Sequence, residues 1–279
     1  MVIGAFIAQL DDAYQRSVWR GISARARESG HGVLCFIGQR LDAPDSSEKS
    51  RNIAYHLAGP ENIDGLIVLS STIGTFRGID GVRQLLASQS IPQISVGLNI
   101  PGVPSVSVYG KPAMADLVRH IIRDHGRRRL ALLAGPLGHS EAEEREAVFR
   151  EELAAQGLEF DERLLVRGSF LTESGAAAAR KLLALGIPFD ALICLNDRMA
   201  MGAMAVLREA GRQIPGEVLV TGFDDISEAR WETPPLSTAN QPLEDMGRAA
   251  VDMLLQVLGG QHPADRHLDC GLVRRQSCG

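Results

Sequence analysis

Short apolar runs alternate with amphipathic segments along the whole chain. The runs predicted as strands cover residues 2–8, 33–37, 66–69, 94–96, 105–108, 130–134, 164–166, 191–195 and 218–220, and residues 267–275 could form a final one. Apolar residues recur at helical spacing around residues 18–29, 53–57, 82–88, 113–125, 141–156, 175–185, 199–210 and 246–257. This alternation predicts an α/β fold with parallel sheets flanked by helices on both faces.

The clearest strand–helix–strand unit lies within residues 191–225. Its first strand ends at Asn196-Asp197, which can cap the following helix, and its second ends at Gly222-Phe223-Asp224-Asp225. A crossover connection makes the two strands parallel, and ligands of open parallel sheets bind beyond the carboxyl ends of the strands. We therefore expect Asn196 and Asp224 at one ligand-binding edge.

The strand–helix pattern runs through the chain twice. No Gly/Ser-rich or Pro-rich spacer separates the two halves, which predicts two similar, closely docked Rossmann-like lobes.

Composition and charge narrow the function. The net charge is −5 and no segment of about 18 apolar residues occurs, so we expect neither membrane insertion nor nucleic-acid binding by this chain alone. Cys35 and Cys194 lie in apolar runs, and no Cys-x-x-Cys pair is present, as is typical of a reducing compartment. The first residues enter a strand directly and lack the features of a signal peptide, which favours a cytoplasmic protein.

Sequence motifs for catalysis are missing. His-Glu-x-x-His, Gly-x-Ser-x-Gly, the phosphate-binding Gly-x-x-x-x-Gly-Lys and Gly-x-Gly-x-x-Gly do not occur, and the seven histidines show no metal-binding spacing. We therefore expect no enzyme, no cofactor and no metal.

A series of motifs in the second half carries a family resemblance. The strongest are the run 196–203 (NDRMAMGA), Gly222–Asp225 (GFDD), and 234–238 (PPLST) with Gln241-Pro242; weaker ones are Ile91-Pro92, Ala134-Gly135-Pro136 and Arg145 before Phe149. In this order they resemble the effector-binding core of the lactose-repressor/galactose-repressor (LacI/GalR) family of bacterial transcription regulators. That family has the type I periplasmic-binding-protein fold, so the resemblance implies three crossovers between the lobes.

The resemblance also implies the domain boundaries. Residues 1–108 plus 240–267 would form the N-terminal lobe, and residues 109–239 plus 268–279 the C-terminal lobe. Three departures stand out. Tyr109 replaces a usual Asp, Val148 replaces a common Gly, and the helix-turn-helix that usually opens the family does not precede Met1.

The resemblance assigns a set of ligand-binding residues. Those implied are Arg145, Asn196, Asp224, Asp12, Ala13, Tyr14, Glu141 and Gln241. Phe170 joins them because it follows a predicted strand at the same edge, where its ring could stack on a sugar or a base. Asp197 would then do most of the helix capping beside Asn196, and Asp225 would cap the next segment. Simpler interpretations remain open: Asn196 and Asp224 as caps, Arg145 as an i,i+4 partner of Glu141, and Phe170 as core.

Together these observations favour a small-molecule sensor. A sugar-like or nucleoside-like effector would bind in the inter-lobe cleft and control DNA binding by a helix-turn-helix module absent from this chain. We expect a homodimer that uses apolar stripes around residues 82–88 and 251–255, which could equally be buried within the lobe. The alternatives are a sensor domain of a kinase or cyclase and, third, a transport sugar-binding protein.

Overall fold

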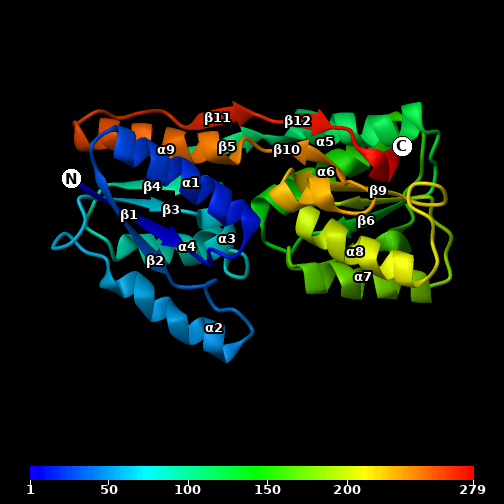
Figure 1. The fold of residues 1–279 in the computed structure, drawn as a ribbon, viewed down its shortest axis with the longest axis horizontal. Helices are drawn as coiled ribbons and strands as arrows, with labels where there is room; N and C mark the ends of the chain where they lie inside the picture. The colour runs from blue at the N-terminus through cyan, green and yellow to red at the C-terminus, as the bar shows by residue number, and fades with distance from the viewer. The chain divides into compact units, whose positions relative to one another are not determined.

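The computed structural model describes residues 1–279, which form two compact units, each built on its own sheet (Figure 1). Unit 1 contains residues 1–108, 138–140 and 242–268. Unit 2 contains residues 109–137, 141–241 and 269–279. Each unit is therefore assembled from separate pieces of the chain.

The sheet of unit 1 has six strands in the order β11-β5-β4-β3-β1-β2. Their bounds are β1 Val2–Ile7, β2 Gly32–Ile37, β3 Gly65–Val68, β4 Gln93–Val96, β5 Ser105–Tyr109 and β11 Arg266–Asp269. Helices α1 (Ala13–Glu28) and α9 (Leu243–Leu258) cover one face, and α2 (Ser46–Ser50), the 3-10 helix η1 (Arg51–Leu57) and α4 (Gly78–Ala87) lie on the other (Figure 1). The short α3 (Ser70–Ile73) follows β3 directly.

The sheet of unit 2 repeats this arrangement in the order β12-β10-β9-β8-β6-β7. Its strands are β6 Leu130–Ala134, β7 Leu165–Arg167, β8 Ala191–Cys194, β9 Leu219–Asp224, β10 Ser237–Asn240 and β12 Gly271–Val273; only β12 pairs in the antiparallel direction, with β10. Its helices are α5 Gly110–Arg119, the π-helix η2 His120–Asp124, α6 Ser140–Ala155, η3 Glu162–Leu164, α7 Thr172–Ala184, α8 Asp197–Glu209, η4 Ser227–Trp231 and η5 Gln276–Cys278. Helices α7 and α8 cover one face, and α5 and α6 the other (Figure 1).

The strands are arranged in the same spatial order in both sheets: β2-β1-β3-β4-β5 in unit 1 corresponds to β7-β6-β8-β9-β10 in unit 2. The predicted class, two Rossmann-like lobes with flanked parallel sheets, is confirmed. The strand interiors of β3, β6 and β8 are wholly buried, as expected for parallel strands covered on both faces.

Two helix pairs pack so closely that glycine is required at each contact. In unit 1, a Cβ atom on Gly21 of α1 would lie 1.9 Å from the carbonyl oxygen of Glu244, and one on Gly247 of α9 would lie 2.1 Å from that of Val18. In unit 2, a Cβ atom on Gly175 of α7 would lie 2.2 Å from the carbonyl oxygen of Met199, and one on Gly202 of α8 would lie 2.0 Å from that of Thr172. Backbone therefore packs on backbone in both pairs.

Several predicted elements differ from those observed. The helix α2 was not among the predicted helices; it begins after Asp45, whose side chain caps it by accepting hydrogen bonds from the backbone N–H groups of Ser47 and Glu48. Residues 267–275 contribute to two strands in different sheets, β11 and β12. The strand β10 was not predicted because it is polar, yet Ser237 and Thr238 are fully buried and hydrogen-bonded.

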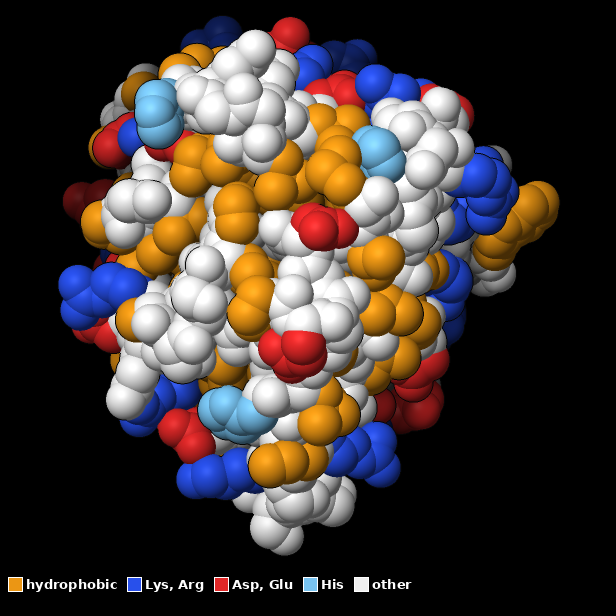
Figure 2. Space-filling view, turned by 90° about the vertical axis from the view of Figure 1, so that its left-hand side faces the viewer, with side chains coloured by type: hydrophobic (Ala, Val, Ile, Leu, Met, Phe, Trp, Pro, Cys, Tyr) orange, Lys and Arg blue, Asp and Glu red, His pale blue; other side chains and the backbone are white.

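The apolar stripes expected at a dimer interface lie inside unit 1. Val82 and Leu86 of α4 and Val251 and Leu254 of α9 are buried in their own unit, which is the alternative that the sequence left open for these stripes. Figure 2 shows one face of the molecule, where hydrophobic side chains are interspersed with polar atoms and Lys and Arg lie mostly around the edge. No helix is both long and apolar enough to cross a membrane.

Candidate functional site

Four of the predicted ligand-binding residues lie at the carboxyl edge of the unit 2 sheet. Phe170 follows β7, Asn196 follows β8, Asp224 ends β9 and Gln241 follows β10. Phe170 and Asp224 have positive φ angles of 62° and 122°. Residues other than glycine rarely adopt such backbone conformations. Each costs about 1–3 kcal/mol, and they cluster at binding sites. The local strain at this edge points to a binding role.

Asp224 and Gln241 form the polar centre of this edge. The Gln241 Nε2 donates a hydrogen bond of 2.6 Å to Asp224 Oδ1, and both side chains are buried. The Gln241 Oε1 is buried without a hydrogen-bond partner. Burial raises the pKa of the Asp224 carboxyl well above its usual range, and the charge of Arg145 opposes that shift. A buried acceptor without a partner is rare in proteins, and a ligand hydroxyl group would satisfy it.

Arg145 reaches this edge from the second turn of α6. Its guanidinium group lies 3.7 Å from the centre of the Phe223 ring, and its Nη1 donates a hydrogen bond of 2.9 Å to the carbonyl oxygen of Leu195. Glu141, one turn earlier, also approaches it, with 3.7 Å between Glu141 Oε2 and Arg145 Nη2. The i,i+4 pair is therefore present, but the ring and the carbonyl oxygen are what hold the buried guanidinium in place.

Asn196 is the N-cap of α8. Its Oδ1 accepts a 3.0 Å hydrogen bond from the backbone N–H of Met199, and its Nδ2 donates one of 3.1 Å to the carbonyl oxygen of Phe170. The expectation that Asp197 would do most of the capping is wrong. The side chain of Asn196 ties the end of β8 to the loop after β7, and this shapes the edge whether or not it touches a ligand.

The Gly222–Asp225 motif has a separate structural task at each position. A Cβ atom on Gly222 would lie 2.1 Å from Asp197 Oδ1, so only glycine leaves room for that buried carboxylate. Phe223 supports Arg145, and Asp224 faces Gln241. Asp225 does not cap the next segment as expected, because its carboxylate binds Arg275 Nη2 at 2.6 Å and Asn240 Nδ2 at 2.9 Å.

Asp197 is a buried residue whose importance the sequence pattern did not reveal. Its Oδ1 accepts a 2.6 Å hydrogen bond from the Thr238 hydroxyl, and its Oδ2 accepts one of 2.9 Å from the backbone N–H of Ile226. Burial raises the pKa of the Asp197 carboxyl to about 7, against the effect of the Thr238 hydrogen bond. The hydrogen bond between Asp197 and Thr238 joins α8 to β10, next to the candidate site.

This raised pKa predicts a specific pH dependence of stability. The native state holds the Asp197 proton up to a pH of about 7, whereas the unfolded state loses it near 3.8, so unfolding should become easier as the pH rises between these values. An Asp197→Asn variant should lack this component. The stability gap between the variant and the wild type should shift in the variant's favour across that window, by at most about 1.4 kcal/mol per pH unit. Denaturant titrations at several pH values measure it, and a gap independent of pH would contradict the prediction.

The corresponding edge of unit 1 carries the other predicted residues. Asp12 is the N-cap of α1 and accepts a 2.9 Å hydrogen bond from the backbone N–H of Gln15, and Ala13 and Tyr14 form the buried first turn. Gln15, which was not predicted, fixes the end of β1, because its Oε1 accepts hydrogen bonds from the backbone N–H groups of Ala8 and Gln9. These hydrogen bonds hold the first turn of α1, which contains Ala13 and Tyr14, against the end of β1.

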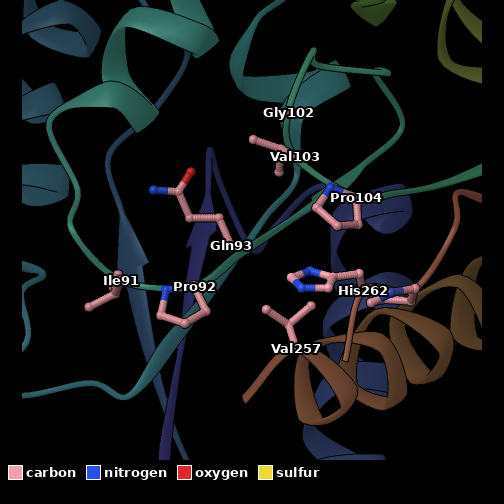
Figure 3. A pocket seen from close by; sticks show the side chains of 9 residues that line it. Ile91, Pro92, Gln93, Gly102, Val103, Pro104, Val257 and His262 are labelled. Atoms are coloured by element: carbon pink, nitrogen blue, oxygen red, sulfur yellow. The ribbon is translucent and has the colours of Figure 1, made fainter. Parts of the chain in front are cut away.

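A hollow of about 330 Å³ lies at the opposite, amino end of the unit 1 strands (Figure 3). Gln93 is the first residue of β4, Pro104 precedes β5, and Val257 and His262 come from α9 and the segment after it. None of the predicted site residues lines it. It is an open indentation between loops and has no group of converging charged side chains.

Comparisons with known proteins agree with the fold. Residues 118–278 match the periplasmic binding protein-like domain family. The chain is 34% identical over 268 residues to the HTH-type transcriptional regulator CelR of Thermobifida fusca, covering 92% of this chain and 74% of CelR. It is 28% identical over 277 residues to the transcriptional repressor CytR of Escherichia coli K12, covering 97% of this chain and 77% of CytR.

Solved structures give the same result. A complex of the regulator CelR with cellobiose superimposes with a TM-score of 0.84 at 28% identity, covering 99% of this chain and 84% of that one. A dimeric Lac repressor has a TM-score of 0.84 at 25% identity, covering 99% of this chain and 98% of that one. This chain belongs to the periplasmic binding protein-like domain family and is the effector-binding module of a LacI/GalR-type transcription regulator.

Proposed function

We propose that the carboxyl edge of the unit 2 sheet binds a small, hydroxyl-rich effector. The observation that carries this proposal is the buried polar centre of Asp224 and Gln241, in which Gln241 Oε1 has no partner. A ligand hydroxyl group would donate a hydrogen bond to that oxygen, and a second hydroxyl would bind the Asp224 carboxyl. Burial makes each such hydrogen bond selective, because a ligand that lacked the hydroxyl would leave the oxygen unpaired.

The surrounding side chains favour a sugar-like or nucleoside-like molecule. Arg145 is fixed by Phe223 and Leu195 and would add charged donors to the same edge. Phe170 supplies an aromatic ring for stacking on a sugar or a base, and Glu141 and Asn196 flank the site. The cellobiose complex of CelR, with which this chain shares its fold, supports the sugar-like class.

We further propose Asp12, Ala13 and Tyr14, at the carboxyl edge of the unit 1 sheet, as effector-binding residues. Tyr14 is buried in the first turn of α1 and would offer both a ring and a hydroxyl group. A Tyr14→Phe variant that weakens effector binding would support this assignment.

We infer that the effector acts by changing the populations of two conformations of the module, and that a helix-turn-helix module outside these residues reads the difference on DNA. Related regulators support this, including an operator-bound dimer of the lac repressor. The chain would act in the cytoplasm, as a homodimer and without catalysis. Sedimentation at micromolar concentration tests the dimer, and a monomer there would contradict it.

A thermal-shift screen tests the effector proposal. Cellobiose, other mono- and disaccharides, nucleosides, nucleobases and sugar phosphates are added singly to the protein. A true effector at about 100 times its Kd should stabilise the native state by about 2.7 kcal/mol. The Asp224→Ala variant should lose the shift, whereas Asp80→Ala, a change at an exposed carboxylate in α4, should keep it. A hit that shifts both variants equally would place the effector elsewhere.

A further inference from the structure

A second group of polar side chains lies in unit 2, beside the first residue of β10, whereas the candidate effector site lies beyond the last residue of that strand. It consists of His120, His125 and Cys278, whose ligand atoms all lie within 4.8 Å of one another. The Nε2 atoms of the two histidines are 3.1 Å apart, and Cys278 Sγ is 3.4 Å from His120 Nε2. No sequence motif indicates this group, since Cys278 and His120 are 158 positions apart.

The two histidines meet because the helix changes its winding at this point. Residues 120–124 form a π-helix, η2, directly after α5. In an α-helix, residues five apart point to different faces, since each residue turns the chain by about 100°. The wider π turn brings His120 and His125 onto the same side, with ring centres 4.6 Å apart. Single π turns are rare and occur frequently at functional sites.

Cys278 is held in place from several directions. Its neighbour Ser277 is fully buried: its Oγ donates a 2.6 Å hydrogen bond to the carbonyl oxygen of Val220 and accepts one of 2.8 Å from the backbone N–H of Ser237. Cys278 Sγ lies 2.9 Å from Ser237 Oγ. The thiol is therefore fixed against β10 and faces the two imidazole rings without needing a large movement.

These separations match the edges of a tetrahedral zinc site. Bonds of about 2.05 Å to nitrogen and about 2.3 Å to sulfur at tetrahedral angles place two nitrogens about 3.3 Å apart and nitrogen and sulfur about 3.6 Å apart. The two short separations around His120 Nε2 are each within about 0.2 Å of these values. The third distance, between the ring nitrogen of His125 and Cys278 Sγ, would adjust to the same geometry when an ion binds both.

The surroundings of His120 have the further features of a metal-binding histidine. Its Nδ1 is 2.7 Å from Asp124 Oδ2, so the carboxylate can hold the ring with Nδ1 protonated and Nε2 facing the cluster. Carboxylates behind ligand histidines orient the ring in this way in many zinc sites. A surface hollow of about 410 Å³, lined by His120, Asp124 and Arg274 among others, adjoins the cluster and gives an ion and a water molecule access from solvent.

We propose that His120, His125 and Cys278 bind one Zn²⁺ ion through two imidazole nitrogens and a thiolate sulfur, with a water molecule as the fourth ligand. Nitrogen and sulfur ligands in a tetrahedral arrangement are those zinc prefers. The Cys278 thiol loses its proton to solvent when the ion binds. The ion would link the end of α5 to the segment after β12 and so stabilise unit 2, independently of the effector.

Zinc titration of the untagged, reduced protein tests the proposal. Calorimetry should give one ion per chain, and saturating Zn²⁺ should raise the melting temperature. Cys278→Ser and His125→Gln should each weaken binding by at least about 100-fold, and Asp124→Asn by about 10- to 100-fold, since it removes only the orienting carboxylate. The controls Cys35→Ser and His56→Gln change a cysteine on β2 and an exposed histidine on η1, and should bind as the wild type does.

Cobalt gives a second readout, and its main result comes from the wild-type protein, so it does not depend on how well a variant folds. Wild-type protein loaded with Co²⁺ should show a thiolate-to-cobalt charge-transfer band, which Cys278→Ser should lose and Cys35→Ser should retain. The proposal is overturned if Zn²⁺ shows no saturable binding, if the cobalt spectrum of the wild type lacks the thiolate band, or if His125→Gln binds Zn²⁺ as tightly as the control variants.

Discussion

An Asp224→Ala variant should bind the effector roughly 10- to 150-fold more weakly than the wild type, because a hydrogen bond to a charged group contributes about 1.5–3 kcal/mol. The loss has two parts here. The ligand hydroxyl loses its acceptor, and Gln241 loses the partner that orients its amide. Asp224→Asn should be less damaging if the effector is a neutral polyol, because burial raises the pKa of this carboxyl and a neutral group of the same shape remains. Calorimetry with the effector found in the screen measures both variants.

Arg145 provides the complementary variant. Arg145→Lys should be costly for an anionic effector, because a lysine cannot form the paired hydrogen bonds of a guanidinium group. Arg145→Ala should also lower stability, since the guanidinium packs on Phe223 and its charge opposes the destabilising burial of Asp224. We therefore compare affinities only for variants whose circular dichroism spectra match the wild type. Wild-type affinity in both Asp224→Ala and Arg145→Lys, together with unchanged binding of a neutral and an anionic candidate, would place the site elsewhere.

A large loss of stability is expected from Gly202→Ala. The new Cβ atom would lie 2.0 Å from the backbone carbonyl oxygen of Thr172. Because a Cβ atom is fixed to its own helix backbone and the oxygen belongs to the other helix, no side-chain rotation relieves the clash. Alanine favours a helix over glycine by about 1 kcal/mol, but overpacking typically costs about 1–3 kcal/mol and a backbone clash stands at the upper end. We expect a net loss of about 2 kcal/mol or more in the free energy of unfolding, measured by denaturant titration.

Gly271→Ala is the matched control for this prediction. No heavy atom lies within 4 Å of the position of its added Cβ atom, and its φ angle lies outside the left-handed region. Its stability should stay close to that of the wild type. If Gly202→Ala is as stable as Gly271→Ala, the two helices are farther apart in solution than the close contact requires.

The fold was largely predictable from the sequence because buried parallel strands leave an unmistakable apolar run. The runs ending at Ala134 and Cys194 are examples, and both strands were predicted within one residue of their observed ends. The polar strand β10 escaped because its buried serine and threonine are satisfied by partners distant in sequence, Arg275 and Asp197. Periodicity contains no information about such pairs.

The candidate site was predictable to a smaller extent. Strand ends indicate which residues share an edge, and this placed Asn196 and Asp224 together in the prediction. Pattern alone did not separate capping from binding, and the family resemblance gave most of the capping to Asp197, although Asn196 performs it. The cluster of His120, His125 and Cys278 depends on a π turn and on a distant segment of chain, neither of which a search for metal-binding spacing detects. The ligand-binding roles themselves stay predictions.

The order of the segments also decides how the gene can be divided. Helix α9 is encoded after nearly all of unit 2, yet it packs against α1 in unit 1 through Gly21 and Gly247. A fragment that stops at residue 108 would therefore expose the apolar side of α1 and of the sheet beside it, and we expect it to aggregate. A soluble unit 1 requires a rearranged coding sequence in which a designed linker joins residues 242–268 to the first segment.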